Sequence, residues 1–531
     1  ITEMLSRNAR MYPDEVSLIE LEPAIKSRKQ ITWMDFEKQA NKFANALIEY
    51  GIKRGDKVVI LMMNCLEWLP VYFGILKAGA MAVPLNFRFT SGEIQKCSEI
   101  AETKILVYGP EFSERINEIR DNLSFVEKFV FVGGNCPNIS ENYTDSYTDC
   151  YTDSYTDILG KYPANDPDVE ISDYEEAALY FTSGTTGTPK PIILTHANLV
   201  SACVTENRHH LQRHEDNFLC IPPLYHTGAK MHWFGSLIVG SKAVILKGVK
   251  PQWILEAVSE EKATIVWLLV PWAQDILDAI ESGEVNLEDY DLDQWRLMHI
   301  GAQPVPPSLI QRWKKVFPHH LYDTNYGLSE STGPGCVHLG IENIHKVGAI
   351  GRPGFNWEVK IVDDKDNPVP DGMVGELILK GPGIMKGYYK NPEATAGVLK
   401  NGWLYSGDMA KKDEDGFIYL VDRKKDVVIS GGENIFPVEI ENYLMTHNDI
   451  KDAAVIGIPD RRLGEIPVAV VETKSGRELT EDMLIQFCQA LPRYKRPRKV
   501  FFDKVPRNPT GKIEKPKLRE KWCNTDKSVF L

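Results

Sequence analysis

Helical and strand-like patterns alternate along the first part of the chain, and this alternation restricts the fold more than any other feature. The segment DFEKQANKFANALIEYG (35–51) ends at Gly51, a common helix stop. Its apolar residues share one helical face: Phe36, Ala40, Phe43, Leu47 and Ile48. A strand KVVILMM (57–63), a helix CLEWLPVYFGILKAG (65–79) and a strand AMAVPLN (80–86) follow. Helices between consecutive strands are the crossovers of a mainly parallel sheet, so we expect a layered α/β protein.

The size and charge of the chain exclude several classes of protein. Because 531 residues are too many for one hydrophobic core, we expect at least two domains. The net charge of -13 argues against a broad nucleic-acid interface, since phosphate backbones are bound by clustered Lys and Arg. No apolar run approaches the length of a membrane span, and the longest, ATIVWLLVPW (263–272), fits a buried strand that stops at Pro271.

The nine cysteines are scattered singly and include no C-x-x-C pair. This usage is typical of reduced thiols, each a small core or surface residue, and it favours a cytoplasmic location. The sequence begins at Ile1 rather than at Met, so absent upstream residues and a removed targeting segment are left open.

The segment YTDSYTDCYTDSYTD (143–157) repeats a four-residue unit almost without change. A period of four matches no solenoid repeat, and Thr, Asp and Ser favour turns. We interpret the segment as an expanded, acidic, exposed loop, with a tyrosine-rich docking tag as the less favoured alternative.

A loop rich in hydroxyl groups and glycine lies within YFTSGTTGTPKPIILTHANL (180–199). An apolar strand (177–181) precedes it, and a helix is expected to start near Thr195 and Asn198. Glycines let the backbone approach an anion, while hydroxyls and a lysine add donors and positive charge. The candidate phosphate-binding residues are Thr182, Ser183, Gly184, Thr185, Thr186, Gly187 and Lys190. Taken alone, the stretch fits a flexible turn equally well.

Further stretches make the sequence similar to the adenylate-forming superfamily of acyl-CoA synthetases, firefly-type luciferases and peptide synthetase adenylation domains. After the loop these are PPLYHTGA (222–229), IGAQPV (300–305), DTNYGLSES (323–331), GELILKGPGIMKGYY (375–389), WLYSGDMA (403–410), GFIYLVDRKKDVVISGGENIFPVEIE (416–441) and VPRNPTGKIEK (505–515). They occur in the family's order and spacing. One departure is Pro191, where most members have glycine; proline removes an N–H and fixes φ there.

The resemblance implies two half-reactions at one site. A carboxylate attacks the α-phosphate of ATP, which expels pyrophosphate and gives an acyl adenylate, and the thiol of coenzyme A then takes the acyl group and releases AMP. The implied catalytic residues are Lys512, inserted between carboxylate and α-phosphate, and Glu330, which holds Mg²⁺. The implied ligands are a small carboxylic acid, ATP, Mg²⁺ and coenzyme A, and the loop from Thr182 to Lys190 retains the outer phosphates.

The resemblance also implies a nucleoside site. Tyr326 lies beside adenine, and Asp408 and Arg423 hydrogen-bond the ribose. The remaining ATP-binding residues that it implies are Gly301, Ala302, Asn325, Gly327 and Ser329.

The acyl pocket that the resemblance implies includes the catalytic candidate His226. Its other members are Met231, Trp233 and Gly327. Because Gly327 stands where acetate-specific members have a tryptophan that closes the pocket, we expect a medium-chain, branched or aromatic acid. We interpret His209 and His210 as surface histidines rather than as part of an acyl or CoA tunnel.

The resemblance implies an α/β architecture with a large, multi-layered N-terminal domain (1–424) that has mixed sheets and a barrel-like portion. A small, mobile α+β lid domain (425–531) carries the catalytic lysine and turns about Lys425 between the half-reactions. Gly431 and Gly432 line the tunnel for the thiol arm of CoA, since glycine leaves room there. Two interpretations of the basic run PRYKRPRK (492–499) are left open: it contacts the phosphates of CoA, or it forms a solvated surface. A homodimer is also left open.

Other functions are weighed against this one. An adenylation enzyme that loads a carrier protein shares every motif, but the sequence ends shortly after Lys512 with no attached carrier. A luciferase-like oxygenase differs only in its products. A non-catalytic binding protein is expected to have lost Lys512 or Glu330. A conventional P-loop kinase is disfavoured because Lys512 is followed by Ile513 rather than by Ser or Thr.

Overall fold

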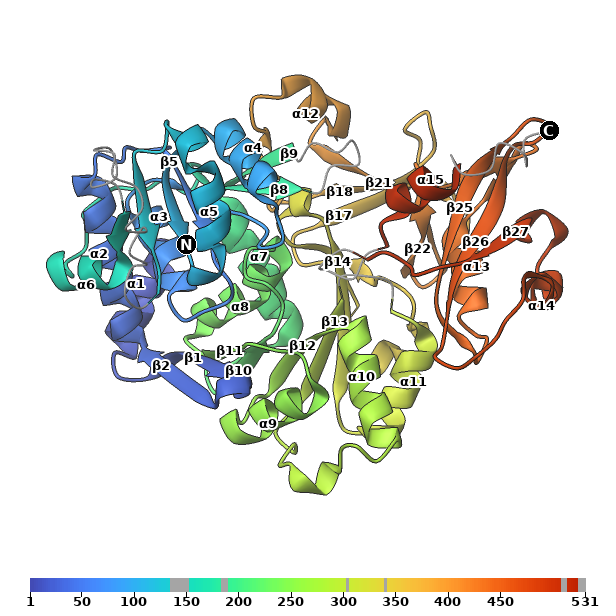
Figure 1. Cartoon of the computed structure of the whole chain (residues 1–531), viewed down its shortest axis with the longest axis horizontal. Coiled ribbons are helices and arrows are strands. Elements are labelled where there is room, and N and C mark those ends of the chain that lie inside the picture. The colour runs from blue at the N-terminus through green and yellow to red at the C-terminus, as the bar shows by residue number, and fades with distance from the viewer. Residues whose placement is uncertain (134–151, 183–189, 302–304, 339–340, 508–512, 524–531) are drawn as a thin grey trace.

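The computed structural model describes residues 1–133, 152–182, 190–301, 305–338, 341–507 and 513–523. Figure 1 shows a broad body formed by the N-terminal and middle parts of the chain, with a smaller C-terminal body beside it. Four sheets form the framework of the described residues. The predicted α/β class, with a large N-terminal and a small C-terminal domain, is confirmed.

The first sheet contains the parallel crossovers that the alternating pattern predicted, in the order β19-β9-β8-β4-β3-β5-β6-β7. Only its β8–β9 and β9–β19 pairs are antiparallel. The strands are β3 (Lys57–Leu61), β4 (Met81–Pro84), β5 (Thr103–Tyr108), β6 (Lys128–Phe131), β7 (Thr152–Ser154), β8 (Glu176–Thr182), β9 (Lys190–Thr195) and β19 (Gly387–Tyr388). The accompanying helices are α2 (Trp33–Glu49), α3 (Trp68–Lys77), α4 (Ser91–Ala101), α5 (Ser113–Ile119) and α6 (Tyr155–Lys161).

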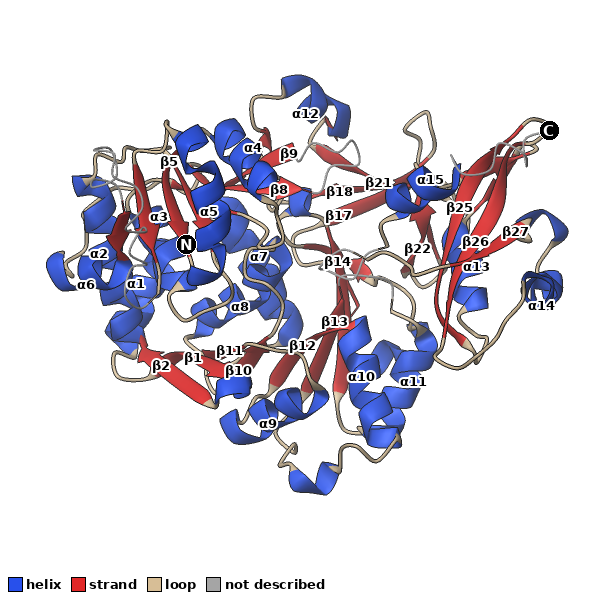
Figure 2. Ribbon diagram, viewed as in Figure 1, coloured by secondary structure: helices blue, strands red, loops and turns tan. Residues whose placement is uncertain are grey.

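The second sheet is also mixed and has the order β16-β15-β14-β13-β12-β10-β11-β1-β2. Its strands are β1 (Val16–Glu22), β2 (Ser27–Thr32), β10 (Asn217–Cys220), β11 (Lys242–Leu246), β12 (Ile265–Leu269), β13 (Leu297–Gly301), β14 (Leu321–Gly327), β15 (Pro334–His338) and β16 (Arg352–Pro353). Its helices are α1 (Thr2–Met11), α7 (His196–His210), α8 (Thr227–Val239), α9 (Pro251–Glu261), α10 (Val270–Glu281) and α11 (Pro307–Val316). Figure 2 shows α7 and α8 between the two large sheets, and one apolar core joins them.

Two mainly antiparallel sheets complete the fold. The third comprises β17 (Glu358–Val362), β18 (Gly375–Lys380), β20 (Leu399–Lys400), β21 (Trp403–Lys412) and β22 (Ile418–Arg423), next to helix α12 (Pro392–Val398). The fourth lies in the C-terminal body, where only β26 and β27 pair in parallel. It comprises β23 (Val428–Ser430), β24 (Glu433–Ile435), β25 (Ile450–Asp460), β26 (Gly464–Thr473) and β27 (Lys499–Phe502), with helices α13 (Pro437–Leu444), α14 (Glu481–Phe487) and α15 (Lys515–Cys523). The exact boundary at 424 and the mobility of the lid stay predictions.

The predicted apolar face of α2 is confirmed except at its end. Phe36, Ala40, Phe43 and Leu47 are fully buried, whereas Ile48 is 38% exposed. Successive residues of an α-helix are about 100° apart, so Ile48 lies to the side of the stripe that Leu47 continues. The prediction for Ile48 was therefore wrong.

The end of the tyrosine repeat is part of the fold rather than an exposed loop. Strand β7 pairs in parallel with β6, and the Asp153 carboxylate lies 2.9 Å from Lys128 Nζ. Tyr155 is 3% exposed and packs against Phe43. The loop prediction was wrong for residues 152–157, which form β7 and the start of α6, because Asp153 and Tyr155 find partners in distant segments. Residues 143–151 lie outside the described part.

Two further expectations concern single features of the chain. None of the helices that the structure describes is both long and apolar enough to cross a membrane. Each cysteine in the described ranges is a free thiol, most of them buried, as expected for small core residues.

Candidate active site

The three predicted nucleoside residues meet at one carboxylate. Asp408 on β21 and Arg423 on β22 are register partners, and Arg423 Nε lies 2.9 Å from Asp408 Oδ1. The Tyr326 hydroxyl, at the end of β14, donates to Asp408 Oδ2. Burial and the neighbouring Asp408 charge raise the pKa of Tyr326 well above its usual value, so its hydroxyl stays protonated at neutral pH. The third sheet and the second sheet therefore join at this point.

The predicted metal ligand Glu330 lies in a short 3₁₀ helix (Ser329–Ser331) just after Tyr326. The Tyr388 hydroxyl, on β19, donates to Glu330 Oε1 over 2.9 Å. Lys190 Nζ lies 5.6 Å from the centre of the Tyr388 ring. A carboxylate and a lysine are thus held around one tyrosine, an arrangement that suits a metal ion and phosphate oxygens.

The phosphate loop is described only at its two ends. Thr182 and Lys190 are register partners at the ends of β8 and β9, and the Thr182 hydroxyl donates to the Lys190 carbonyl over 3.2 Å. The loop residues Ser183, Gly184, Thr185, Thr186 and Gly187 lie outside the described residues. The unusual Pro191 continues β9, and its carbonyl accepts a hydrogen bond from the Tyr389 N–H. The strand pairing thus accommodates the proline.

The predicted adenine wall is partly described. The Asn325 side-chain amide donates to the carboxylate of Glu206 on α7. Gly301 ends β13, and Ala302 lies outside the described residues. A Cβ atom placed on Gly327 would lie 2.4 Å from the Gly333 carbonyl oxygen. Because this backbone contact alone requires glycine, Gly327 is not by itself a sign of a wide acyl pocket.

The predicted acyl-pocket residues lie on and before α8. His226 is the N-cap, and its Nδ1 accepts the Gly228 N–H over 3.2 Å, which leaves Nε2 as the protonated donor of the neutral ring. Trp233 is fully buried against Phe36, Phe73 and Phe234, so aromatic packing accounts for it without a ligand. The side chain of Met231 lies outside the described residues.

The predicted hinge and CoA residues lie around the start of the fourth sheet. Lys425 is exposed in the turn between β22 and β23, where partial desolvation and the positive charges of Arg423 and Arg519 lower its pKa. Gly431 and Gly432 have φ angles of 60° and 88° and form the turn of the β23–β24 hairpin. This conformation favours glycine on its own account, so the role in CoA binding stays a prediction.

A buried charge cluster joins β22 to the C-terminal body. Asp422 accepts the Val438 N–H of α13 over 3.0 Å, and Lys515 Nζ lies 2.9 Å from Glu441 Oε1. Asp422, Glu441 and Lys515 are each at most 7% exposed. Burial raises the pKa of Asp422 to about 6, although the charge of Lys515 acts in the opposite direction. The segment that follows Lys512 is thus anchored next to the predicted hinge.

The charge cluster predicts a specific pH dependence of stability. Because the pKa of Asp422 is higher when folded than when unfolded, its stabilising effect is complete below about pH 3.8 and is lost as the pH rises through 6. Relative to Asp422→Asn, the wild type is expected to lose about 3 kcal/mol of stability over this range. Thermal unfolding of both proteins between pH 4 and 7 tests this. The exposed Asp482→Asn variant is the control, and parallel curves for Asp422→Asn and wild type would contradict the prediction.

Family models cover most of the chain. Residues 5–389 match the model of AMP-binding enzymes, and residues 439–512 match that of the AMP-binding enzyme C-terminal domain. The chain belongs to the AMP-binding enzyme family. This confirms the resemblance to the adenylate-forming superfamily.

The relatives of this AMP-binding enzyme are CoA ligases. It is 31% identical to a feruloyl-CoA synthase of an Amycolatopsis species, over 97% of this chain and 98% of that protein. It is 30% identical to a long-chain-fatty-acid–CoA ligase of Mycobacterium tuberculosis, over 98% of each chain. The protein is therefore an enzyme of the acyl-CoA and aryl-CoA ligase group.

Solved structures agree with this assignment. An anthranilate CoA ligase in complex with anthranoyl-AMP has a TM-score of 0.84 at 26% identity, covering 98% of this chain and 96% of that one. ATP-bound MatB from Rhodopseudomonas palustris has a TM-score of 0.86 at 25% identity, covering 98% and 99%. The family is one that binds ATP.

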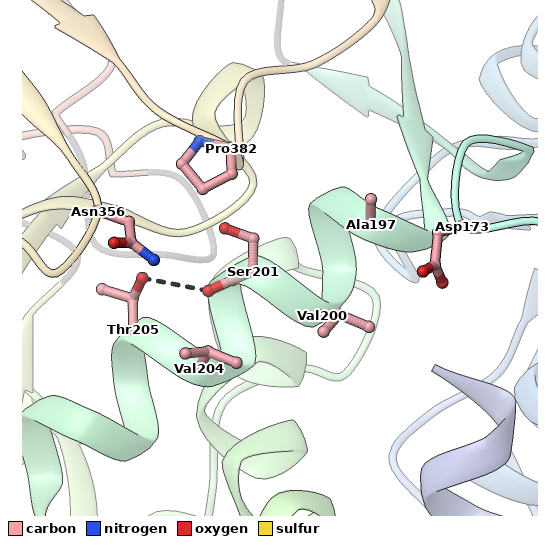
Figure 3. Close-up of a pocket in the computed structure, with 8 residues that line it drawn as sticks. All are labelled: Asp173, Ala197, Val200, Ser201, Val204, Thr205, Asn356 and Pro382. Carbon is pink, nitrogen blue, oxygen red and sulfur yellow. Dashed lines mark hydrogen bonds between the residues drawn. The ribbon is translucent and has the colours of Figure 1, made fainter.

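A hollow along α7 of this AMP-binding enzyme is lined by residues other than those of the predicted site. Figure 3 shows it between α7 and the segment around Pro382, with the Thr205 hydroxyl bonded to the Ser201 carbonyl. It is lined by Asp173, Ala197, Val200, Ser201, Val204, Thr205, Asn356 and Pro382. None of the predicted site residues is among them.

Two histidines of the AMP-binding enzyme contradict their predicted position. His209 and His210 are 8% and 2% exposed, so the prediction of surface histidines was wrong. They face His299 and Asp323, which the sequence analysis did not single out as a pair. Their positions in the sequence could have indicated this pair. His299 lies on the strand that ends at Gly301, and Asp323 lies on the strand that carries Tyr326, and both of these are predicted site residues.

Proposed function

We propose that this enzyme is an ATP-dependent, AMP-forming carboxylic acid–CoA ligase. It joins a carboxylic acid to AMP with release of pyrophosphate, and then transfers the acyl group to coenzyme A with release of AMP. The observation that carries the proposal is the Asp408 carboxylate, which holds Tyr326 and Arg423 together from two sheets. The Tyr326 ring can lie against the base of a nucleoside, and the Asp408 carboxylate can accept hydrogen bonds from its ribose hydroxyls. Glu330, the proposed metal ligand, follows Tyr326 in the sequence by four residues.

In the first half-reaction an anion approaches a polyanion, so positive charge must be directed at the transition state. Lys190 supplies part of it from the end of the phosphate loop, and Lys512 supplies the rest at the reacting carboxylate. Glu330 suits Mg²⁺, which is usually held by one or two carboxylates together with phosphate oxygens, and when bound the ion neutralises phosphate charge. Lys512 lies outside the described residues, so its role rests on the sequence motif.

In the second half-reaction the thiol of coenzyme A attacks the acyl carbon of the adenylate. The C–S bond forms as the bond to the AMP oxygen breaks. We assign the required exchange of catalytic groups to rotation of the C-terminal domain about Lys425. Gly431 and Gly432, at the exposed tip of a hairpin, then leave space for the thiol arm.

The proposed acid is medium-chain, branched or aromatic. Relatives that act on ferulate and on long-chain fatty acids support an apolar acyl group. The Nδ1 and Cε1 edge of the His226 ring faces Gly228, and the Trp267 ring lies beside the same glycine, so an imidazole and an aromatic ring meet at the start of α8. Together with the feruloyl-CoA synthase among the relatives, this favours an aryl or branched acid over a short one.

The test is pyrophosphate release from ATP and Mg²⁺ across a panel of acids, with and without CoA, with products identified by mass spectrometry. We expect pyrophosphate, AMP and one acyl-CoA to appear together, with aromatic or medium-chain acids preferred over acetate. Pyrophosphate without a CoA thioester would indicate a carrier-protein acceptor instead. ADP as the only nucleotide product would overturn the proposal.

A further inference from the structure

A cluster of imidazoles and carboxylates lies between α7 and the second sheet. Glu206, His209 and His210 follow one another at helical spacing on α7. His299 on β13 and Asp323 on β14 are register partners on neighbouring parallel strands, so both side chains emerge on one face. All five residues are at most 8% exposed.

The side-chain atoms converge on a small volume. His210 Nε2 lies 3.2 Å from His299 Nδ1, 3.3 Å from Asp323 Oδ2 and 3.4 Å from Glu206 Oε2. His209 Nε2 lies 3.1 Å from the same Asp323 oxygen, and His299 Nδ1 makes a close contact with Asp323 Oδ1. Ligand atoms of His210, His299 and Asp323 all fall within 4.8 Å of one another.

Hydrogen bonds alone do not explain why so many ligand atoms lie close to His210 Nε2. One ring nitrogen carries at most one proton, yet His210 Nε2 has a nitrogen and two carboxylate oxygens within 3.4 Å. The cluster also contains two buried carboxylates, Glu206 and Asp323, and burying such charges is costly unless positive charge accompanies them. The nearby Arg296 guanidinium is paired with Asp216 instead. A divalent cation would provide a partner for the crowded His210 nitrogen and would also supply the positive charge that the two buried carboxylates require.

We propose that His210, His299 and Asp323 form a buried zinc site. Zinc binds nitrogen and oxygen ligands at about 2.0–2.2 Å in a tetrahedron, whose edges are then about 3.3–3.5 Å. Two of the three edges, the 3.2 and 3.3 Å separations around His210 Nε2, match this value. The contact between His299 Nδ1 and Asp323 Oδ1 is closer than an edge, so this pair has to move apart when zinc binds. A water completes the coordination, while His209 approaches the Asp323 ligand oxygen and orients it. The Glu206 carboxylate, 3.4 Å from the liganding Nε2 of His210, adds negative charge beside the cation.

The site is separate from the magnesium site proposed at Glu330, and its role is structural. Zinc here ties α7 to β13 and β14, the two strands that carry Gly301 and Tyr326. Glu206 transmits this order further, because its other carboxylate oxygen accepts the Asn325 amide. The Trp267 ring, 5.9 Å from the His299 ring, covers the cluster on an apolar side.

The test measures zinc in the untagged full-length enzyme after dialysis against a metal-free buffer. We expect about one zinc per chain by mass spectrometry, and Co²⁺ exchanged into the site should show the strong visible absorption of tetrahedral coordination. Chelation should lower the melting temperature. Wild-type enzyme without stoichiometric zinc after growth with zinc, and unable to bind added zinc, would overturn the proposal.

Variants separate this site from adventitious binding. Asp323→Asn and His299→Gln should each weaken zinc binding by more than about tenfold, as expected for lost ligands. The exposed His319→Gln variant should bind as wild type does. If the first two variants do not fold, His210→Gln and the Co²⁺ spectrum of the wild type decide the question. Equal affinity of the ligand variants and wild type would overturn the proposal, whatever the activity of the CoA ligase reaction.

Discussion

Replacing Lys512 by alanine is expected to slow acyl-adenylate formation by about 10²–10³-fold, the range found when one directed donor is removed from a transition state. The ammonium group is proposed to lie between the substrate carboxylate and the α-phosphate, where negative charge gathers in that step. Thioester formation from supplied acyl adenylate should be nearly unchanged, because the rotated C-terminal domain has withdrawn the lysine by then. Two assays on one preparation distinguish the steps: acid-dependent exchange of pyrophosphate into ATP, and acyl-CoA formation from synthetic adenylate.

The matched control for this change is Lys517→Ala. Lys517 lies on α15, is exposed, and pairs only locally with Glu514, so its loss removes a lysine of the same segment without touching the proposed chemistry. Equal loss of both half-reactions in Lys512→Ala would contradict the division of labour between two domain positions. An unaffected exchange reaction would remove Lys512 from the catalytic residues.

Replacing Glu330 by glutamine should also reduce adenylate formation, by about 10²-fold or more, and raise the Mg²⁺ concentration needed for half-maximal rate. Glutamine keeps the size and one oxygen acceptor but lacks the charge with which a carboxylate holds Mg²⁺. The Tyr388 hydroxyl still has an oxygen to donate to, so the local fold should survive. Initial rates of pyrophosphate release over a Mg²⁺ titration give both numbers.

Tyr388→Phe distinguishes the loss of the metal-binding charge of Glu330 from a local disturbance of the structure around it. It removes the hydrogen bond to Glu330 yet keeps the ring 5.6 Å below the Lys190 ammonium group. We expect a loss of less than about tenfold, since the carboxylate itself remains. A Glu330→Gln enzyme with an unchanged Mg²⁺ requirement would place the metal on other groups.

Patterns that depend on local sequence predicted the local structure well. The Thr195–Asn198 helix start is confirmed, because Thr195 and Asn198 form a reciprocal capping box at α7. The buried strand expected to stop at Pro271 is also confirmed, because β12 ends at Leu269 and Pro271 lies in the first turn of the following helix. The nucleoside residues were placed by resemblance, and the structure brings Tyr326, Asp408 and Arg423 together.

Features that depend on distant partners were not predictable in the same way. His209 and His210 carry polar side chains in a helix of weak amphipathic character, so nothing nearby in the sequence indicates that they are buried. Their burial follows from His299 and Asp323, which become neighbours only when β13 and β14 pair. Gly327 was interpreted through pocket size, whereas the close approach of the Gly333 carbonyl depends on a strand pairing that no single motif describes.

The last residues of the tyrosine repeat belong to strand β7 and to the start of helix α6, and this affects which copy of the unit can pair with the sheet. Strand β7 is the outermost strand beyond β6, and its three residues Thr-Asp-Ser occur once more upstream in the repeat, at 144–146. Every copy contains a tyrosine, so the last copy is distinguished by the Ile-Leu-Gly-Lys that follows it, in which Ile158 is buried in the core together with Tyr155. The residues after the repeat, rather than the repeat itself, therefore mark the copy that pairs with β6.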